Sequence, residues 1–153
     1  MLPHLQKKKI LNLILAKVCD TGWNKESIQV AAEQSKFSFD EVMTDFDNDI
    51  GEIVKFFNRC VDEEMVSGLR RGVKKKHSIR GQIKKAILLR LRILSRNKKA
   101  FKNTMAYLSF PQNLTLSLDL LYSTADSIWR SIGDKSTDFN FYTKRILLSG
   151  IYL

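Results

Sequence analysis

Helix-breaking residues are scarce throughout this sequence. Only 7 Gly and 2 Pro occur among its 153 residues, while 44% of the residues are hydrophobic. Glycine and proline interrupt helices, and disorder requires a low hydrophobicity, so this composition favours long helices in an ordered chain. We therefore predict an all-α fold, which its length makes a single domain with a buried core.

Apolar residues recur at helical spacing in four parts of the first half of the chain. The predicted helices cover residues 5–20, about 25–34, a segment that starts at Ser38, and about 48–67. The third start is marked by "SFDE", a capping box in which Ser38 accepts from the backbone and Glu41 reaches back. Gly68 is expected near the end of the fourth helix.

The second half predicts four further helices, over residues 78–94, about 98–109, 113–132 and from Ser136 or Thr137 to the end. Gly133 suits the C-terminal cap of the third of these, and Ser136 or Thr137 suits the N-cap of the last. The helix over residues 78–94 is expected to have one solvent-exposed face. Its apolar face is predicted to carry Ile83, Ile87, Leu91 and Leu94, and its solvent-exposed face Lys85, Arg92 and Arg96.

The charge of the protein is concentrated in one run. The formal net charge is +10, and between Arg70 and Lys102 there are fourteen basic residues and no acidic one. A summed positive field attracts acidic lipid surfaces and nucleic acid alike. We rank a solvated helix face first, an anionic membrane surface second and nucleic acid last.

The sequence carries no pattern typical of an enzyme or a metal site. It lacks HExxH, Walker A and GxGxxG motifs, and His4 and His77 both lie in charged segments. Cys19 and Cys60 are far apart, without a CxxC or a nearby histidine pair. We therefore predict that the protein is not an enzyme and uses no metal or other cofactor.

Three motifs occur in a fixed order near the end of the chain: "ADSIW" at residues 125–129, "GDKSTDFN" at 133–140 and "YTKR" at 142–145. With these motifs the C-terminal part resembles the ubiquinone-biosynthesis accessory proteins usually called Coq-nine. The resemblance implies a TetR-like helical bundle forming one compact unit. Helix-turn-helix-like N-terminal helices would occupy residues 1–68, and lipid-binding and partner-docking helices residues 69–153.

The resemblance also implies a function. The family forms homodimers, makes no chemical change itself, binds isoprenoid quinone intermediates or similar lipids, and presents them to the demethoxyubiquinone hydroxylase. By motif match Asp126 and Trp129 lie on the hydroxylase-binding face, and Tyr122 shares that helix face by spacing. Arg130 stands where the family often has a second aromatic residue, so Asp126 could instead pair with it at i, i+4. Candidates to line the lipid cavity, by the same pattern that a plain core would show, are Leu116, Leu120, Phe139, Ile146 and Ile151.

A TetR-like fold makes a DNA-binding transcriptional regulator the alternative function. A recognition helix reads DNA in the major groove, and Lys and Arg contacts to phosphate supply most of the affinity. The third predicted helix and its exit, "SFDEVMTDFDNDIGE", contain six acidic residues and no basic one. This surface would repel a phosphate backbone, so we expect no nucleic-acid partner.

The predicted location is the bacterial cytoplasm, peripheral at the inner membrane, with the mitochondrial matrix side as its counterpart in eukaryotic relatives. No apolar run approaches the roughly 20 residues needed to span a bilayer, and the N-terminus does not read as a signal or transit peptide. The family pattern continues beyond Leu153 into an amphipathic membrane-binding helix. We therefore expect no membrane docking through that helix in this sequence.

Overall fold

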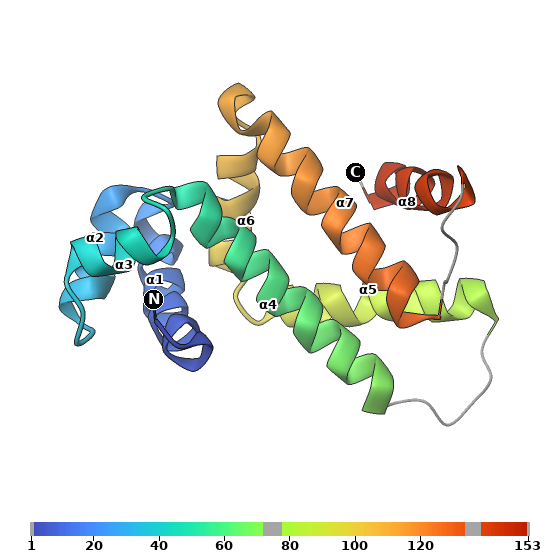
Figure 1. Ribbon diagram of the computed structural model, residues 1–153, viewed down its shortest axis with the longest axis horizontal. Helices are drawn as coiled ribbons and strands as arrows, with labels where there is room; N and C mark the ends of the chain where they lie inside the picture. The colour runs from blue at the N-terminus through green and yellow to red at the C-terminus, as the bar shows by residue number, and fades with distance from the viewer. Residues whose placement is uncertain (1, 72–77, 134–138, 153) are drawn as a thin grey trace. The chain divides into compact units, whose positions relative to one another are not determined.

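The computed structural model describes residues 2–71, 78–133 and 139–152, without the side chains of residues 139–141, 151 and 152. Across these ranges the fold is all-α and contains no strand, as predicted (Figure 1). The predicted caps at Ser136 and Thr137 lie outside the described residues. The helices are α1 (His4–Thr21), α2 (Lys25–Glu33), α3 (Phe39–Asp45), α4 (Ile50–Arg71), α5 (Ile79–Ser95), α6 (Lys98–Leu108), the 3₁₀ turn η1 (Pro111–Asn113), α7 (Leu114–Ser131) and α8 (Phe139–Tyr152).

Side-chain caps begin several helices where the sequence predicts them. The Ser38 hydroxyl accepts from the backbone N–H of Glu41 at 3.2 Å, and the Glu41 carboxylate accepts from the backbone N–H of Ser38 at 2.8 Å. This confirms the capping box, which satisfies two N–H groups that lack partners inside the helix. At the start of α5 the Ser78 hydroxyl accepts from the backbone N–H of Gly81 at 3.2 Å, without a reciprocal side chain, and Gly133 follows α7 with a φ of 88°.

α4 differs from its prediction at both ends. Asp47 and Asn48 take the left-handed conformation that these residue types tolerate, so the helix begins after them, at Ile50. At the other end α4 continues past Gly68 to Arg71. Gly68 is a contact position, because a Cβ added there would lie 2.7 Å from a terminal carbon of Leu89 on α5.

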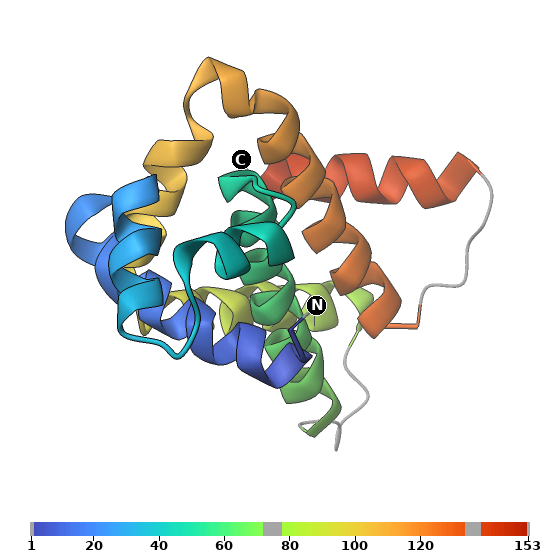
Figure 2. The same cartoon turned by 60° about the vertical axis from the view of Figure 1, so that its left-hand side comes forward.

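Contacts divide the chain into two compact units. Unit 1 contains the residues up to Cys60 together with Asn97–Leu114, so it holds α1 to α3, the first half of α4, and α6. Within it α1 packs on α2 and α6, and α2 packs on α3 (Figure 2). The indole of Trp23 lies near the rings of Phe57 and Tyr107, and its N–H donates to the Thr104 hydroxyl at 2.9 Å.

Unit 2 contains Val61–Arg96 and Thr115–Leu153, and therefore the second half of α4, α5, α7 and α8. Polar contacts join neighbouring helices inside this unit. Asp62 of α4 pairs with Arg90 of α5 and accepts a hydrogen bond from Thr124 of α7 at 3.3 Å. Figures 1 and 2 both show α8 passing beside α7. The buried apolar side chains of the unit include Val61, Met65, Leu69, Ala86, Ile93, Leu94, Leu120, Ala125, Ile128 and Leu148.

The prediction of which residues form the apolar face of α5 was partly wrong. Leu91 is 45% exposed, whereas Arg90, from the basic run, is only 5% exposed. The helix turns this way because the buried carboxylate of Asp62 takes up the Arg90 guanidinium, and a buried charge requires such a partner. Ala86, Ile93 and Leu94 share the buried face with Arg90.

Candidate functional site

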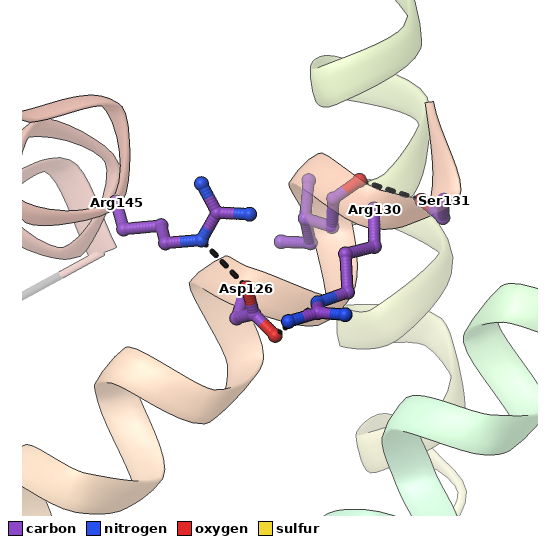
Figure 3. Close-up of polar contacts among 5 residues, drawn as sticks. Asp126, Arg130, Ser131 and Arg145 are labelled. Atoms are coloured by element: carbon purple, nitrogen blue, oxygen red, sulfur yellow. Dashed lines mark hydrogen bonds and ion pairs between the residues drawn. The ribbon is translucent and has the colours of Figure 1, made fainter. Parts of the chain in front are cut away.

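The last two helices of unit 2 are joined by a charged cluster centred on Asp126 (Figure 3). One carboxylate oxygen accepts from Nε of Arg145 on α8 at 2.6 Å, and the other accepts from Nε of Arg130, one turn further along α7, at 2.7 Å. The i, i+4 pair expected between Asp126 and Arg130 is thus confirmed. Asp126 holds a cation on each side, one from its own helix and one from the next.

Trp129 lies one turn after Asp126 and also contacts α8. Its indole N–H donates to the backbone carbonyl of Lys144 at 3.1 Å. The ammonium of Lys144 lies 5.3 Å from the centre of the same ring, which is within reach of a cation–π interaction. Two residues of the "ADSIW" motif, Asp126 and Trp129, therefore contact two residues of the "YTKR" motif, Arg145 and Lys144, across the seam between α7 and α8.

The members of this seam differ in how much solvent they see. Arg145 is 1% exposed and closes the inner side, while the side chain of Asp126 retains 23% exposure and that of Arg130 67%. Trp129 is half-buried, and Tyr122, two turns before it, is 37% exposed. The outward edge of the seam is therefore formed by Tyr122, Asp126 and Arg130, with part of Trp129.

The residues predicted to line a lipid cavity do not share one environment. Leu120 is buried and Leu116 half-buried, whereas Ile146 on α8 is 64% exposed. The side chains of Phe139 and Ile151 lie outside the described residues. Among the described side chains of α8, the exposed large apolar ones are Tyr142, Ile146 and Leu147.

No sequence pattern predicted the roles of Lys144 and Arg145, although both lie in the "YTKR" motif. The two cations are adjacent in a helix whose flanking residues are mostly apolar, so nothing local separates a buried arginine from a solvated one. The signal that was present is the co-occurrence of "ADSIW" with "YTKR". Both motifs carry the family resemblance, and in the structure they are in contact.

A second carboxylate cluster lies in the interior of unit 2. Asp62 and Arg90 are 4% and 5% exposed, and Thr124 is 3% exposed. Burial raises the pKa of Asp62 to about 6, although the charge of Arg90 and the hydroxyl of Thr124 favour its ionised form. These three residues join α4, α5 and α7, and they are shielded from a partner.

Neither cluster has the composition of a metal site. Among the described residues no group of three or more His, Cys, Asp or Glu side chains is placed to hold a metal ion. The ion pairs of both aspartates are with arginine: Asp62 pairs with Arg90, and Asp126 pairs with Arg130 and Arg145. The chemistry that these residues can provide is recognition by charge, hydrogen bonds and an aromatic ring.

The predicted helix-turn-helix region presents acidic side chains to solvent. Asp40 and Glu41 of α3 and Asp47 and Asp49 of the following turn are all exposed. Asp45 instead lies between α3 and α1, where it pairs with Lys7 at 2.8 Å. An exposed acidic surface at this place opposes contact with a phosphate backbone.

A known protein family matches the two helices that form the seam. The COQ9 family model matches residues 114–153, which are α7 and α8 with their connection. The chain is 34% identical to "Ubiquinone biosynthesis protein COQ9, mitochondrial" of Rattus norvegicus over 94% of this chain and 48% of the relative. The protein of the same name from Homo sapiens is 32% identical, over 94% of this chain and 47% of the relative. The chain belongs to the COQ9 family.

A less similar COQ9 protein also aligns with most of this chain. The probable COQ9 protein of Dictyostelium discoideum is 28% identical over 95% of this chain and 50% of its own length. The chain thus spans about half the length of the curated relatives it matches. The names of those relatives place them in mitochondria and describe no enzymatic activity. In the part of this COQ9 chain that the structure describes, no helix is long and apolar enough to cross a membrane.

Proposed function

We propose that this COQ9 chain acts in ubiquinone biosynthesis as a non-catalytic accessory factor. It binds an isoprenoid quinone intermediate or a similar lipid and presents it to the demethoxyubiquinone hydroxylase. The observation that carries the proposal is the location of the COQ9 family match, which covers the two helices whose motifs bind each other. The relatives' printed names supply the pathway.

The hydroxylase is proposed to dock on the outward edge of the α7–α8 seam, at Tyr122, Asp126, Trp129 and Arg130. An aromatic residue beside a charged one is typical of interface hot spots. Arg145 and Lys144 hold Asp126 and Trp129 from the inner side, so their positions are fixed before a partner arrives. A side chain that is already fixed loses less conformational entropy on binding.

The lipid is proposed to contact apolar side chains of α7 and α8. Ile146 and Leu147, each 64% exposed, provide aliphatic surface on α8, and Leu118, 53% exposed, provides it on α7. Transfer of such surface from water to an isoprenoid chain is favourable by about 25 cal/mol per Å² of apolar area. Leu116, Leu120, Phe139 and Ile151 stay candidates for the same lipid contact.

Binding of the hydroxylase is tested with Tyr122→Ala and Trp129→Ala in a pull-down with purified enzyme. Both variants should weaken capture strongly while circular dichroism stays helical. Arg59→Ala is the matched control, because Arg59 is also exposed and stacks near an aromatic ring, Phe56, in unit 1. If Trp129→Ala loses its helical signal, the residue is part of the core, and unchanged capture by both variants would contradict the docking surface.

Binding of lipid is tested by native mass spectrometry followed by organic extraction of the purified chain. A quinone or isoprenoid in near-stoichiometric amount is expected. The double variant Ile146→Ser and Leu147→Ser should reduce it, whereas Leu5→Ser with Met105→Ser, which changes two exposed apolar residues of unit 1, should not. A chain that carries no lipid and takes up none from added ubiquinone precursor would contradict the lipid-binding function.

The TetR-like arrangement of the helices and a homodimer are part of the same proposal, as is a peripheral position at a membrane. Light scattering during size-exclusion chromatography should give twice the chain mass of 17.7 kDa. A transcriptional regulator is disfavoured by the exposed carboxylates on α3 and the turn after it.

A further inference from the structure

The outer face of α5 combines exposed leucines with exposed cations. Apart from Ile79 at its first position, the exposed residues of α5 fall within one third of the helix circumference at 100° per residue. Leu88 and Leu91 are 53% and 45% exposed. The face, which we term the α5 outer face, consists of Arg80, Lys84, Leu88, Leu91, Arg92 and Ser95.

The buried face of the same helix fixes this orientation. Ala86, Arg90, Ile93 and Leu94 are buried on the opposite side, and Arg90 is tied to Asp62 of α4. Leu89 lies against Gly68 of α4. Because α5 is held from one side by these contacts, the leucines of the outer face are directed away from the core of unit 2.

The charged residues of α5 and of the segments next to it in the sequence are all basic. No acidic residue occurs between Arg70 and Lys102. Arg70 and Arg71 are exposed at the end of α4. Arg96, just after α5, pairs with Glu64 of α4 and is not counted in the outer face.

We propose that the α5 outer face is a docking site for an anionic phospholipid surface. At the boundary between headgroups and acyl chains, the cations meet lipid phosphates while the leucines leave water, so that both kinds of side chain contribute. A nucleic acid would gain binding energy only from the cations of this face. Proteins that bind single strands stack bases on aromatic side chains, and this face has no aromatic residue. The site is independent of the proposed quinone and hydroxylase contacts, which lie on α7 and α8.

The charge contribution is tested by vesicle co-sedimentation with the full chain. Vesicles of phosphatidylcholine mixed with phosphatidylglycerol should bind it, and pure phosphatidylcholine vesicles should bind it far less. Each surface Lys or Arg near an anionic leaflet strengthens binding about fivefold, so the triple variant Arg80→Glu, Lys84→Glu and Arg92→Glu should lose at least about 100-fold. Added salt should weaken wild-type binding, because it screens exposed charges.

The matched control reverses three other cations of the acid-free run. Lys98, Lys99 and Lys102 on α6 are also exposed, and their reversal to Glu changes the net charge by the same amount. This control should retain most of the binding. If both triple variants lose it equally, overall charge rather than the α5 outer face attracts the membrane, and the proposal is overturned.

The apolar contribution has its own test. Leu88→Ser with Leu91→Ser should weaken binding to the mixed vesicles at least about fivefold, because two aliphatic side chains no longer leave water. Leu5→Ser with Met105→Ser serves as control. Unchanged binding after the Leu88 and Leu91 substitutions would contradict insertion of this face.

Two further results would overturn the proposal. One is a wild-type chain that does not bind the mixed vesicles at low salt. The other is preferential binding of duplex DNA or RNA over the vesicles, lost with the α5 triple reversal, which would assign the face to nucleic acid. Capture of the hydroxylase in the pull-down is expected to be unchanged in all α5 variants, so failure here is distinguishable from failure of the proposed function.

Discussion

Unit 2 contains two aspartates that each pair with an arginine from another helix, and the two pairs lie in different surroundings. Asp62 and Arg90 have side chains that are both 6% exposed, so their pair is closed off from water. Asp126 pairs with the fully buried Arg145 on one side and with Arg130, whose side chain is 67% exposed, on the other. The Asp62 cluster therefore presents no charged side chain to solvent, whereas the Asp126 cluster presents Arg130 and part of Asp126.

The difference shows how the same ion-pair chemistry can serve packing or recognition. A closed pair fixes the packing of helices, because separating it would leave a buried charge without its partner. A pair with an open edge fixes its own side chains from within and still presents charged atoms to solvent, where a partner can use them. We therefore expect substitutions around Asp62 to affect folding and substitutions around Asp126 to divide between folding and binding.

The largest effect is expected for Arg90→Leu. The substitution leaves the Asp62 carboxylate buried without its main cation, and breaking a buried pair in this way destabilises by about 3–5 kcal/mol. Chemical denaturation followed by circular dichroism measures the loss of free energy of unfolding. The double variant Asp62→Leu and Arg90→Leu is the control, because removal of both charges should restore most of the stability. A double variant as unstable as Arg90→Leu would show that size or packing, not the charge, matters at this position.

The next effect is a pH dependence that belongs to Asp62. Its pKa in the folded chain is about 6, above the ordinary 3.8, because burial disfavours the charged form. The folded state therefore binds the proton more tightly, and this contribution is present below about pH 4 and lost as the pH rises through 6. Relative to Asp62→Asn, the wild-type chain should lose up to about 3 kcal/mol of stability between pH 4 and 7.

The comparison with Asp62→Asn isolates this single group, since all other titrating residues are common to both chains. Denaturation curves at several pH values provide the measurement. If Asp62→Asn fails to fold, the carboxyl carbon of Asp62 can be titrated directly by NMR in the wild-type chain. A midpoint near or below the ordinary value would contradict the dominant effect of burial.

At the seam the inner partner should matter more than the outer one. Arg145→Met removes a fully buried guanidinium that donates to Asp126 across α7 and α8, and loss of a charged hydrogen bond of this kind costs about 2 kcal/mol. Hydrogen exchange should show faster opening of α8 than in the wild-type chain. Lys144→Met is the matched control. It removes the neighbouring side-chain cation, while the backbone carbonyl of residue 144 can still accept from the indole N–H of Trp129. Equal acceleration of exchange in both variants would contradict the special role of Arg145.

The sequence predicted the local part of this arrangement and missed the part that depends on distant contacts. The capping box of α3 and the pair between Asp126 and Arg130 involve residues three or four apart, where helix geometry alone decides which side chains meet. The pair between Asp62 and Arg90 joins residues 28 apart, and that between Asp126 and Arg145 joins residues 19 apart. A helical pattern assigns an arginine to the solvent-exposed face, so it could not show that Arg90 and Arg145 are buried.

The candidate site was predictable to a similar extent. The C-terminal motifs indicated the COQ9 family and placed Asp126 and Trp129 in the site, and the family is confirmed. Which atoms of these residues face α8 could not be predicted, since it depends on how α7 and α8 pack. The residues expected to contact lipid also depended on packing, and Ile146 and Leu120 lie in opposite environments although both are apolar members of amphipathic helices.

The smallest effect on stability is expected for Arg130→Ala, and it bears most directly on the open edge of the seam. Arg130 is largely exposed, and an i, i+4 pair on a helix surface contributes only about 0.3–0.5 kcal/mol. Thermal unfolding should therefore be nearly unchanged. Capture of the hydroxylase should fall clearly, because loss of Arg130 removes a cation from the docking edge and alters the charge presented by Asp126.

Arg130→Lys separates the two roles of this side chain. Lysine keeps the charge but cannot reproduce the planar guanidinium, so partial recovery of hydroxylase capture would indicate that charge dominates and no recovery that the geometry of the pair matters. In both cases stability stays near that of the wild-type chain, in contrast to Arg90→Leu. A large loss of stability in Arg130→Ala would mean that the edge of the seam is closed like the Asp62 cluster, and the distinction between the two aspartates would no longer hold.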